Sequence, residues 1–178
     1  LARHDGGYST FRVNITSALN EGENLLAVSV DNGKNRTVYP QKADFTFYGG
    51  LYRPVRLLIV PAAHFRLDYY GGSGIRVTPK LSDDLKSAEV TVEAWVNGLA
   101  DHVKFTVGDK ISDAEVVDGY AQSVFVLDPV HLWNGTDDPY LYTAQAELDS
   151  GDCVKTFFGC RSIAFDPDQG FLLNGKSY

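Results

Sequence analysis

Apolar and polar residues alternate along much of the chain, and the clearest example is AEVTVEAWVNG, residues 88–98. Every second position there is apolar: Ala88, Val90, Val92, Ala94 and Val96. The positions between them carry Glu89, Thr91, Glu93, Trp95 and Asn97. A repeat of two residues places successive side chains on opposite faces of an extended chain. The segment is therefore predicted to be a strand with one buried face, ended by the Asn97-Gly98 turn.

Similar alternation predicts further strands, at residues 11–15, 26–30, 55–59, 74–78, 103–107, 122–127, 140–148 and 153–158. Helical periodicity is nearly absent. One helical turn is expected in TSALNEGEN, with Thr16 as its N-cap and Gly22 at its end. The ten Tyr, ten Phe and two Trp residues also favour β structure. The predicted fold class is all-β.

A domain boundary is predicted near Pro61, which follows the apolar segment VRLLIV. Residues 61–163 hold about seven predicted strands, the number and spacing of an immunoglobulin-like β-sandwich. Residues 1–60 hold only three or four, so a sheet built from them alone would leave unpaired backbone edges.

The two ends of the chain suggest a piece of something longer. The sequence starts at Leu1 without an initiator methionine. It ends in FLLNGKSY, where Asn174-Gly175 is a strong hairpin-turn signal followed by only three residues. The second strand of that hairpin is therefore expected to be missing.

Composition excludes some functions. The formal net charge of −7 argues against a nucleic-acid partner, because binding would require neutralisation of phosphates. The longest apolar run, LLIVPAA, is too short for a membrane-spanning helix, and nothing resembles a signal peptide. A soluble protein, cytoplasmic or periplasmic, is expected. Cys153 and Cys160 lie too far apart along one extended segment to bridge, so both are expected to be free thiols.

The residue patterns contain no self-contained active site. The four histidines are scattered without metal-ligand spacing, and no nucleophile motif or phosphate-binding loop is present. Three acidic pairs are interpreted as turn-formers that bond the local backbone: Asp83 with Asp84, Asp137 with Asp138, and Asp166 with Asp168.

The stretch around Asp44 admits two interpretations. Asp44 precedes Phe45, Phe47 and Tyr48, and Gly49-Gly50 then interrupts the chain. A structural interpretation is a strand, a glycine bend and another strand. A functional interpretation is a sugar-binding surface, since carboxylates accept hydrogen bonds from hydroxyls and aromatic faces cover the apolar side of a pyranose.

Four passages resemble glycoside hydrolase family 2. GGYSTFRVNITSALNEGENLLAVSVDN and DFTFYGGLYRPVRLLIV resemble the second half and the closing signature of that family's sugar-binding jelly-roll domain. HLWNGTDDPYLYTAQAELD is similar to a passage of its immunoglobulin-like domain. FFGCRSIAFDPDQGFLLNGKSY resembles the exit from that domain toward a catalytic TIM barrel. The four passages follow one another in the family's order over nearly the whole chain.

The resemblance implies three parts: residues 1–60 as the end of a partial jelly-roll sheet, 61–163 as the immunoglobulin-like sandwich, and 164–178 as the lead-in to a barrel. It implies a retaining glycosidase, a β-galactosidase in the first place, with β-glucuronidase or β-mannosidase as alternatives. The two catalytic glutamates would lie outside this chain, which would support the barrel and complete its sugar site. A non-catalytic carbohydrate-binding or adhesion module is the rival from another class.

The resemblance also implies a role for Asp44, which occupies the place of an aspartate that contacts the sugar and a sodium ion. Sodium or magnesium would be the only cofactors, and then of the intact enzyme. The implied partners are a β-linked glycoside, the enzyme's own barrel domain and further copies of the protein. Pro54 departs from the family pattern, which often has Asp at that position, so the strand there is expected to begin differently or to lie at an edge.

Overall fold

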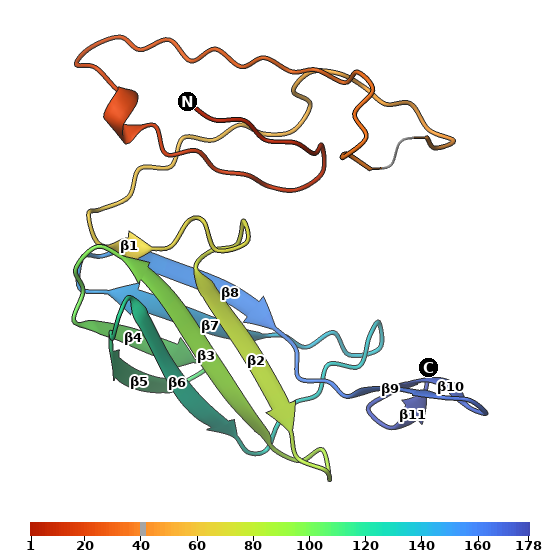
Figure 1. Ribbon diagram of the computed structural model, residues 1–178. Coiled ribbons are helices and arrows are strands. Elements are labelled where there is room, and N and C mark those ends of the chain that lie inside the picture. Colours follow the sequence, from red (N-terminus) through yellow and green to blue (C-terminus); the bar gives the residue numbers. More distant parts are fainter. Residues whose placement is uncertain (40–41) are drawn as a thin grey trace. The chain divides into compact units, whose positions relative to one another are not determined.

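The computed structural model describes residues 1–39 and 42–178. The chain divides into two compact units, Leu1–Ile59 and Val60–Tyr178. The strands of the described part all belong to the second unit, which contains two four-stranded sheets and a smaller three-stranded one (Figure 1). The fold class is all-β, as the alternation of residues predicted.

The first sheet is built around β3, Ala88–Asn97, whose burial alternates along its length. Three antiparallel strands pair with β3: β1 (His64–Phe65), β2 (Ile75–Leu81) and β6 (Tyr120–Leu127). The apolar positions predicted to be buried are all buried, from Ala88 to Val96. Strand β3 is therefore the strand that the sequence predicted, with the predicted face toward the core.

The second sheet has the strand order β5-β4-β7-β8, with every pair antiparallel. Its strands are β4 (His102–Val107), β5 (Lys110–Glu115), β7 (Tyr142–Leu148) and β8 (Cys153–Phe158). Strands β2, β3 and β6 thus form one layer and β4, β5, β7 and β8 the other, which is an immunoglobulin-like arrangement of seven strands. One core cluster draws on both layers, from Val90 and Val92 on β3 to Val103 and Phe105 on β4.

Strand β5 was not predicted from the sequence. Its residues, KISDAE, lack an apolar face, and Ile111 is 63% exposed. The strand lies at the edge of its sheet and is held by its ladder with β4, from Val107 opposite Lys110 to His102 opposite Glu115. Backbone pairing across a short hairpin leaves no hydrophobic repeat in the sequence, so the pattern could not reveal this strand.

The hairpin at the end of the chain corrects a second expectation. Strands β9 (Ile163–Asp166), β10 (Gly170–Leu173) and β11 (Lys176–Ser177) form a three-stranded antiparallel sheet. Leu173 pairs with Lys176 around Asn174-Gly175, and both turn residues have positive φ, 52° and 74°. The second strand is therefore present, because the two residues β11 contains are enough to close a two-residue turn of this kind.

The strands predicted at 11–15, 26–30 and 55–59 are not formed: residues 1–39 and 42–59 contain no strand. Many of their apolar side chains are exposed, for example Phe11 at 54%, Leu26 at 61% and Leu57 at 71%. Alternation specifies only which face of a strand would be buried. Ladder hydrogen bonds and a covering layer must come from other segments, and none of the described residues of this unit supplies them.

The predicted helical turn is shorter than expected. A 3-10 helix, η1, covers Thr16–Ala18, and Ile15 rather than Thr16 stands at its N-cap. The side chain of Asn14 instead accepts a hydrogen bond from the Thr16 N–H at 3.0 Å. The helix ends at Leu19, whose backbone is extended, before Gly22 is reached. Asn14 forms a local Asx turn that satisfies the first donor, so Thr16 is free to enter the helix.

Candidate functional site

Asp44 lies on an exposed bend of the first unit. The aromatic residues after it pack locally: the Phe45 and Phe47 ring centroids lie 5.1 Å apart. The Asn32 amide donates a hydrogen bond to the Phe47 carbonyl at 3.4 Å, which ties this loop to an earlier segment. The structure therefore gives an exposed carboxylate beside aromatic rings, in a loop and not in the strand-bend-strand arrangement of the structural interpretation.

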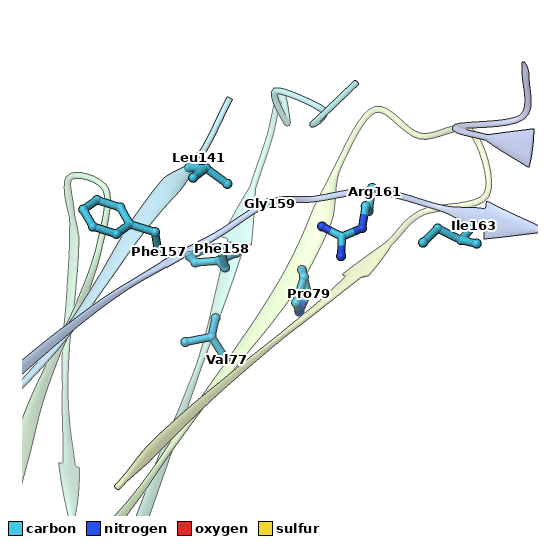
Figure 2. Close-up of a pocket in the computed structure, with 8 residues that line it drawn as sticks. All are labelled: Val77, Pro79, Leu141, Phe157, Phe158, Gly159, Arg161 and Ile163. Atoms are coloured by element: carbon cyan, nitrogen blue, oxygen red, sulfur yellow. The ribbon is translucent and has the colours of Figure 1, made fainter. Parts of the chain in front are cut away.

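A groove opens along one side of the sandwich, between the edge strands β2 and β8 (Figure 2). It has a volume of about 500 Å³. Its lining is Val77, Pro79, Leu141, Phe157, Phe158, Gly159, Arg161 and Ile163. Pro79 has no N–H to offer a further strand, which suits its place on an edge. The lining of the groove offers apolar contacts and one guanidinium but no carboxylate. It is therefore suited to packing against an apolar group and not to acid-base chemistry.

The outer face of the first sheet carries a second cluster of aromatic and charged residues. Trp95 stacks on Tyr69 at 3.9 Å between ring centroids, and the Arg76 guanidinium lies 5.5 Å from the centre of the Trp95 ring. Arg76 also donates two hydrogen bonds to the Glu93 carboxylate, at 2.6 and 2.7 Å. The Tyr120 hydroxyl donates to the same carboxylate at 3.0 Å. Neighbouring strands thus contribute to one connected polar ladder.

The electrostatics of this ladder argue against catalysis by Glu93. The hydrogen bonds from Arg76 lower the pKa of the Glu93 carboxyl. Partial burial raises this pKa, and the hydrogen bond from Tyr120 lowers it. Other carboxyls with hydrogen-bonded partners behave alike, since Arg66 lowers the pKa of Asp68 and Ser82 that of Asp84. A general acid of a glycosidase requires a raised pKa. None of these three carboxylates is therefore suited to act as a general acid.

The bridge between Arg76 and Glu93 is expected to make stability depend on pH. Because the pKa of Glu93 is lower in the folded state, the stabilisation is present above the ordinary glutamate value of 4.5 and is lost as the pH falls through the lowered pKa. The Glu93→Gln variant should therefore have a lower urea midpoint than the wild type at pH 7, with the difference shrinking toward pH 3. Urea unfolding followed by tryptophan fluorescence at several pH values measures this.

Glu89→Gln is the matched control, because Glu89 lies on the same strand and face and is exposed. Its difference from the wild type should stay small at every pH. Equal pH dependence in both variants would contradict the assignment of the effect to the Arg76 bridge.

The acidic pairs act as turn-formers at two of the three sites. Asp84 accepts hydrogen bonds from the Ser82 hydroxyl and the Lys86 N–H. Asp166 accepts the N–H groups of Asp168 and Gln169 at 2.9 and 2.8 Å. Asp138 differs, since its carboxylate lies 2.7 Å from Nε2 of His131, whose ring stacks on Tyr140. That pair joins the two sides of the loop at 131–140, a contact that the sequence alone did not indicate.

Neither cysteine forms a disulfide, as predicted. Cys160 is buried, and this burial raises the pKa of its thiol to about 11. A neutral thiol is a poor nucleophile and a poor metal ligand.

Within residues 1–39 and 42–178, no group of three or more His, Cys, Asp or Glu side chains lies close enough together to hold a metal ion. Nor does any helix of this described part have the length and apolarity to cross a membrane.

Asn174 is the residue whose importance sequence reasoning missed. It was interpreted only as half of a hairpin turn, yet its side chain is 8% exposed and hydrogen-bonds across to the sandwich. The sequence LLNGK is typical of a turn whether or not the asparagine side chain is buried. The signal that could have identified it, a hydrogen-bond partner 40 residues earlier in the chain, exists only in the folded structure.

Comparison with known proteins finds β-glucuronidases and β-galactosidases among the proteins similar to this chain. The chain is 31% identical to a β-glucuronidase of Bacteroides fragilis, over 99% of this chain and 28% of that protein. It is 29% identical to a β-galactosidase of Thermoanaerobacterium thermosulfurigenes, over 99% of this chain and 26% of that protein. The crystal structure of an FMN-binding β-glucuronidase from Facaelibacterium prausnitzii L2-6 matches with a TM-score of 0.74 and 37% identity, covering 83% of this chain and 24% of that one. The chain thus spans less than a third of each of these relatives.

The family model for glycosyl hydrolases family 2 matches residues 73–161, half of the chain. The match starts just before β2 and ends just after β8, so it covers the strands that form the two layers of the sandwich. On this evidence the chain belongs to glycosyl hydrolases family 2.

Proposed function

We propose that the whole protein is a retaining glycosidase that hydrolyses terminal β-linked glycosides, and that this chain contributes its non-catalytic immunoglobulin-like part. Family membership supports the proposal. A retaining mechanism needs two carboxyl groups about 5–5.5 Å apart, one with a raised pKa. The carboxyls with resolved shifts among the described residues have lowered values instead, which agrees with a catalytic centre on a domain outside this chain.

β-Glucuronides are the substrates we favour. The observation that carries this choice is the match to the Bacteroides fragilis β-glucuronidase, which is 31% identical over 99% of the chain. This replaces the β-galactosidase that the sequence resemblance put first. β-Galactosides remain the second candidate, because a β-galactosidase is 29% identical over the same share of the chain.

The parts of the chain have separate proposed roles. Residues 1–60 would complete a jelly-roll sheet, 61–163 form the immunoglobulin-like support, and 164–178 would lead into a catalytic barrel. The groove between β2 and β8 suits such support, because Phe157 and Ile163 are 63% and 52% exposed there. Contact with a neighbouring domain would remove this apolar surface from water. Self-association of the intact enzyme and a bound sodium or magnesium ion are further proposals.

Asp44 is proposed as a substrate contact of the intact enzyme, with a shared sodium ion. Its exposure beside Phe45 and Phe47 supports this, because both the carboxylate and the ring faces are accessible. With a β-glucuronide the contact would be to ring hydroxyls, since a carboxylate repels the carboxylate of the sugar.

The test is an assay of the full-length protein with the 4-nitrophenyl β-glycosides of glucuronic acid, galactose and mannose. We expect kcat/KM for the glucuronide to exceed that for the galactoside at least about tenfold, because a site built for a carboxylate loses a charged hydrogen bond with a neutral sugar. Preferred hydrolysis of the galactoside would select the second candidate. No hydrolysis of any of the three by a folded protein would favour a carbohydrate-binding or adhesion module instead.

In the active enzyme, Asp44→Ala should lower kcat/KM about tenfold or more, the loss expected for one hydrogen bond to a charged group. Glu23→Ala is the matched control, because Glu23 is an exposed carboxylate of the same unit on a different loop. Equal activity of both variants would remove Asp44 from the sugar site.

A further inference from the structure

We infer that Asn174 is a positioning residue, which fixes the direction in which the chain leaves the sandwich toward the next domain. The inference rests on the proposed function, in which a catalytic domain follows this hairpin. It concerns the clamp between two segments: the exit hairpin, residues 161–178, and the sandwich loop, residues 131–138.

Both polar atoms of the Asn174 side chain are hydrogen-bonded. Nδ2 donates to the Trp133 carbonyl at 3.0 Å and to Oδ1 of Asn134 at 2.6 Å. Oδ1 accepts the N–H of Ser162 at 2.9 Å, and the Asn174 N–H donates to the Ser162 carbonyl at 2.9 Å. A primary amide has two N–H donors and one carbonyl oxygen, and all of them are engaged here.

The backbone at Asn174 restricts the choice of residue further. Its φ is 52°, in the left-handed region that glycine and asparagine tolerate best. Glycine would satisfy the backbone but lacks the amide, and aspartate would tolerate the backbone but cannot donate. Asparagine is thus the residue that serves both the turn and the bonds across to the loop.

Other contacts connect the same two segments. The Arg161 guanidinium lies 4.9 Å from the centre of the Trp133 ring. Directly before the hairpin, the Cys160 carbonyl accepts the Trp133 N–H at 2.9 Å. The Thr136 N–H reaches the Tyr178 hydroxyl at 3.4 Å. The hairpin and the loop therefore behave as one body, with Asn174 as its buried centre.

Hydrophobic burial does little to hold this hairpin. Leu173 is buried, but Phe165 is 81% exposed and Ile163 52% exposed. Where apolar contact is sparse, a satisfied polar network decides the orientation, because each alternative orientation would leave the amide without partners. Loss of the network should therefore loosen the direction of the hairpin and leave the sandwich folded.

The test uses the full-length protein with Asn174→Asp, and with Asn174→Gly as a second variant that keeps the backbone. Peptide hydrogen exchange should increase about tenfold over residues 161–178 and stay unchanged in β3 and β4. At a temperature well below unfolding, kcat/KM should fall about tenfold per active site titrated with a covalent glycosidase inactivator. A merely destabilised enzyme would keep its kcat per titrated site.

Asn97→Asp is the matched control, because Asn97 also precedes a glycine but is exposed. It should match the wild type in both measurements. Unchanged exchange in both Asn174 variants overturns the clamp, and raised exchange with unchanged kcat/KM overturns the positioning role. If the wild-type protein hydrolyses no glycoside, the proposed function fails on its own, and the exchange result then decides the clamp.

Discussion

Replacing Phe105 with alanine is expected to lower the free energy of unfolding by about 3–5 kcal/mol. Phe105 lies on β4, is 0% exposed and faces the core between the two layers. Its strand is paired on both sides, with Ser112 and Ala146 as its neighbours. The sheet around it cannot move inward easily, so a cavity should remain and the loss should lie at the upper end of the range.

Urea unfolding of the 178-residue chain measures this loss through Trp95 and Trp133 fluorescence, since both tryptophans belong to the sandwich unit. Ile111→Ala is the control, because Ile111 lies on the neighbouring β5 and is 63% exposed. It should cost less than about 0.5 kcal/mol. A loss below about 1 kcal/mol for Phe105→Ala would contradict the single core described for the sandwich.

Replacing Gly98 with alanine is expected to cost about 3 kcal/mol, through two effects at one position. The φ of Gly98 is +82°, which by itself costs a residue with a Cβ about 1–2 kcal/mol. The added Cβ would also overlap the Ala62 carbonyl oxygen and approach the Ala63 Cα to 2.9 Å. Both neighbours are backbone, so the segment at 62–63 must shift away from the end of β3, and its pairing through β1 should suffer.

Gly108→Ala separates the two effects. Gly108 has a similar φ of +61°, but nothing lies within 4 Å of the position that its Cβ would take. This variant should lose only the conformational part, about 1–2 kcal/mol. The same urea experiment compares them, and equal losses would show that close approach of the backbone at Ala62 is not important.

The sequence predicted the sandwich well where one face of a strand is buried. In β3 the alternation of valine and alanine with polar residues is a direct consequence of the pleat, so the sequence carries the buried face explicitly. The same reasoning placed β4, β6 and β8 within one or two residues. It failed for β5, which is held by backbone pairing with β4, because peptide groups are alike in every residue.

The first unit shows the limit of the same reasoning. Leu26, Val28 and Val30 alternate as regularly as the valines of β3, yet they remain exposed and form no strand. A strand exists only with a neighbour to pair with and a layer to cover it, and both are properties of the surroundings. The candidate sugar contact, Asp44, belongs to this unit and was identified through family resemblance and its aromatic neighbours.

The sequence by itself determined the all-β class, the buried face of the central strand, the free cysteines and the family. Each of these follows from local periodicity, short motifs or the spacing of two residues along an extended segment. Only the tertiary structure decided that Asn174 bonds to Trp133 and Asn134, that Arg76 fixes the charge of Glu93, and that Gly98 has no room for a side chain. These contacts join residues 17 to 41 positions apart in the sequence, or bring backbone close to backbone. They exist only once the polypeptide has folded.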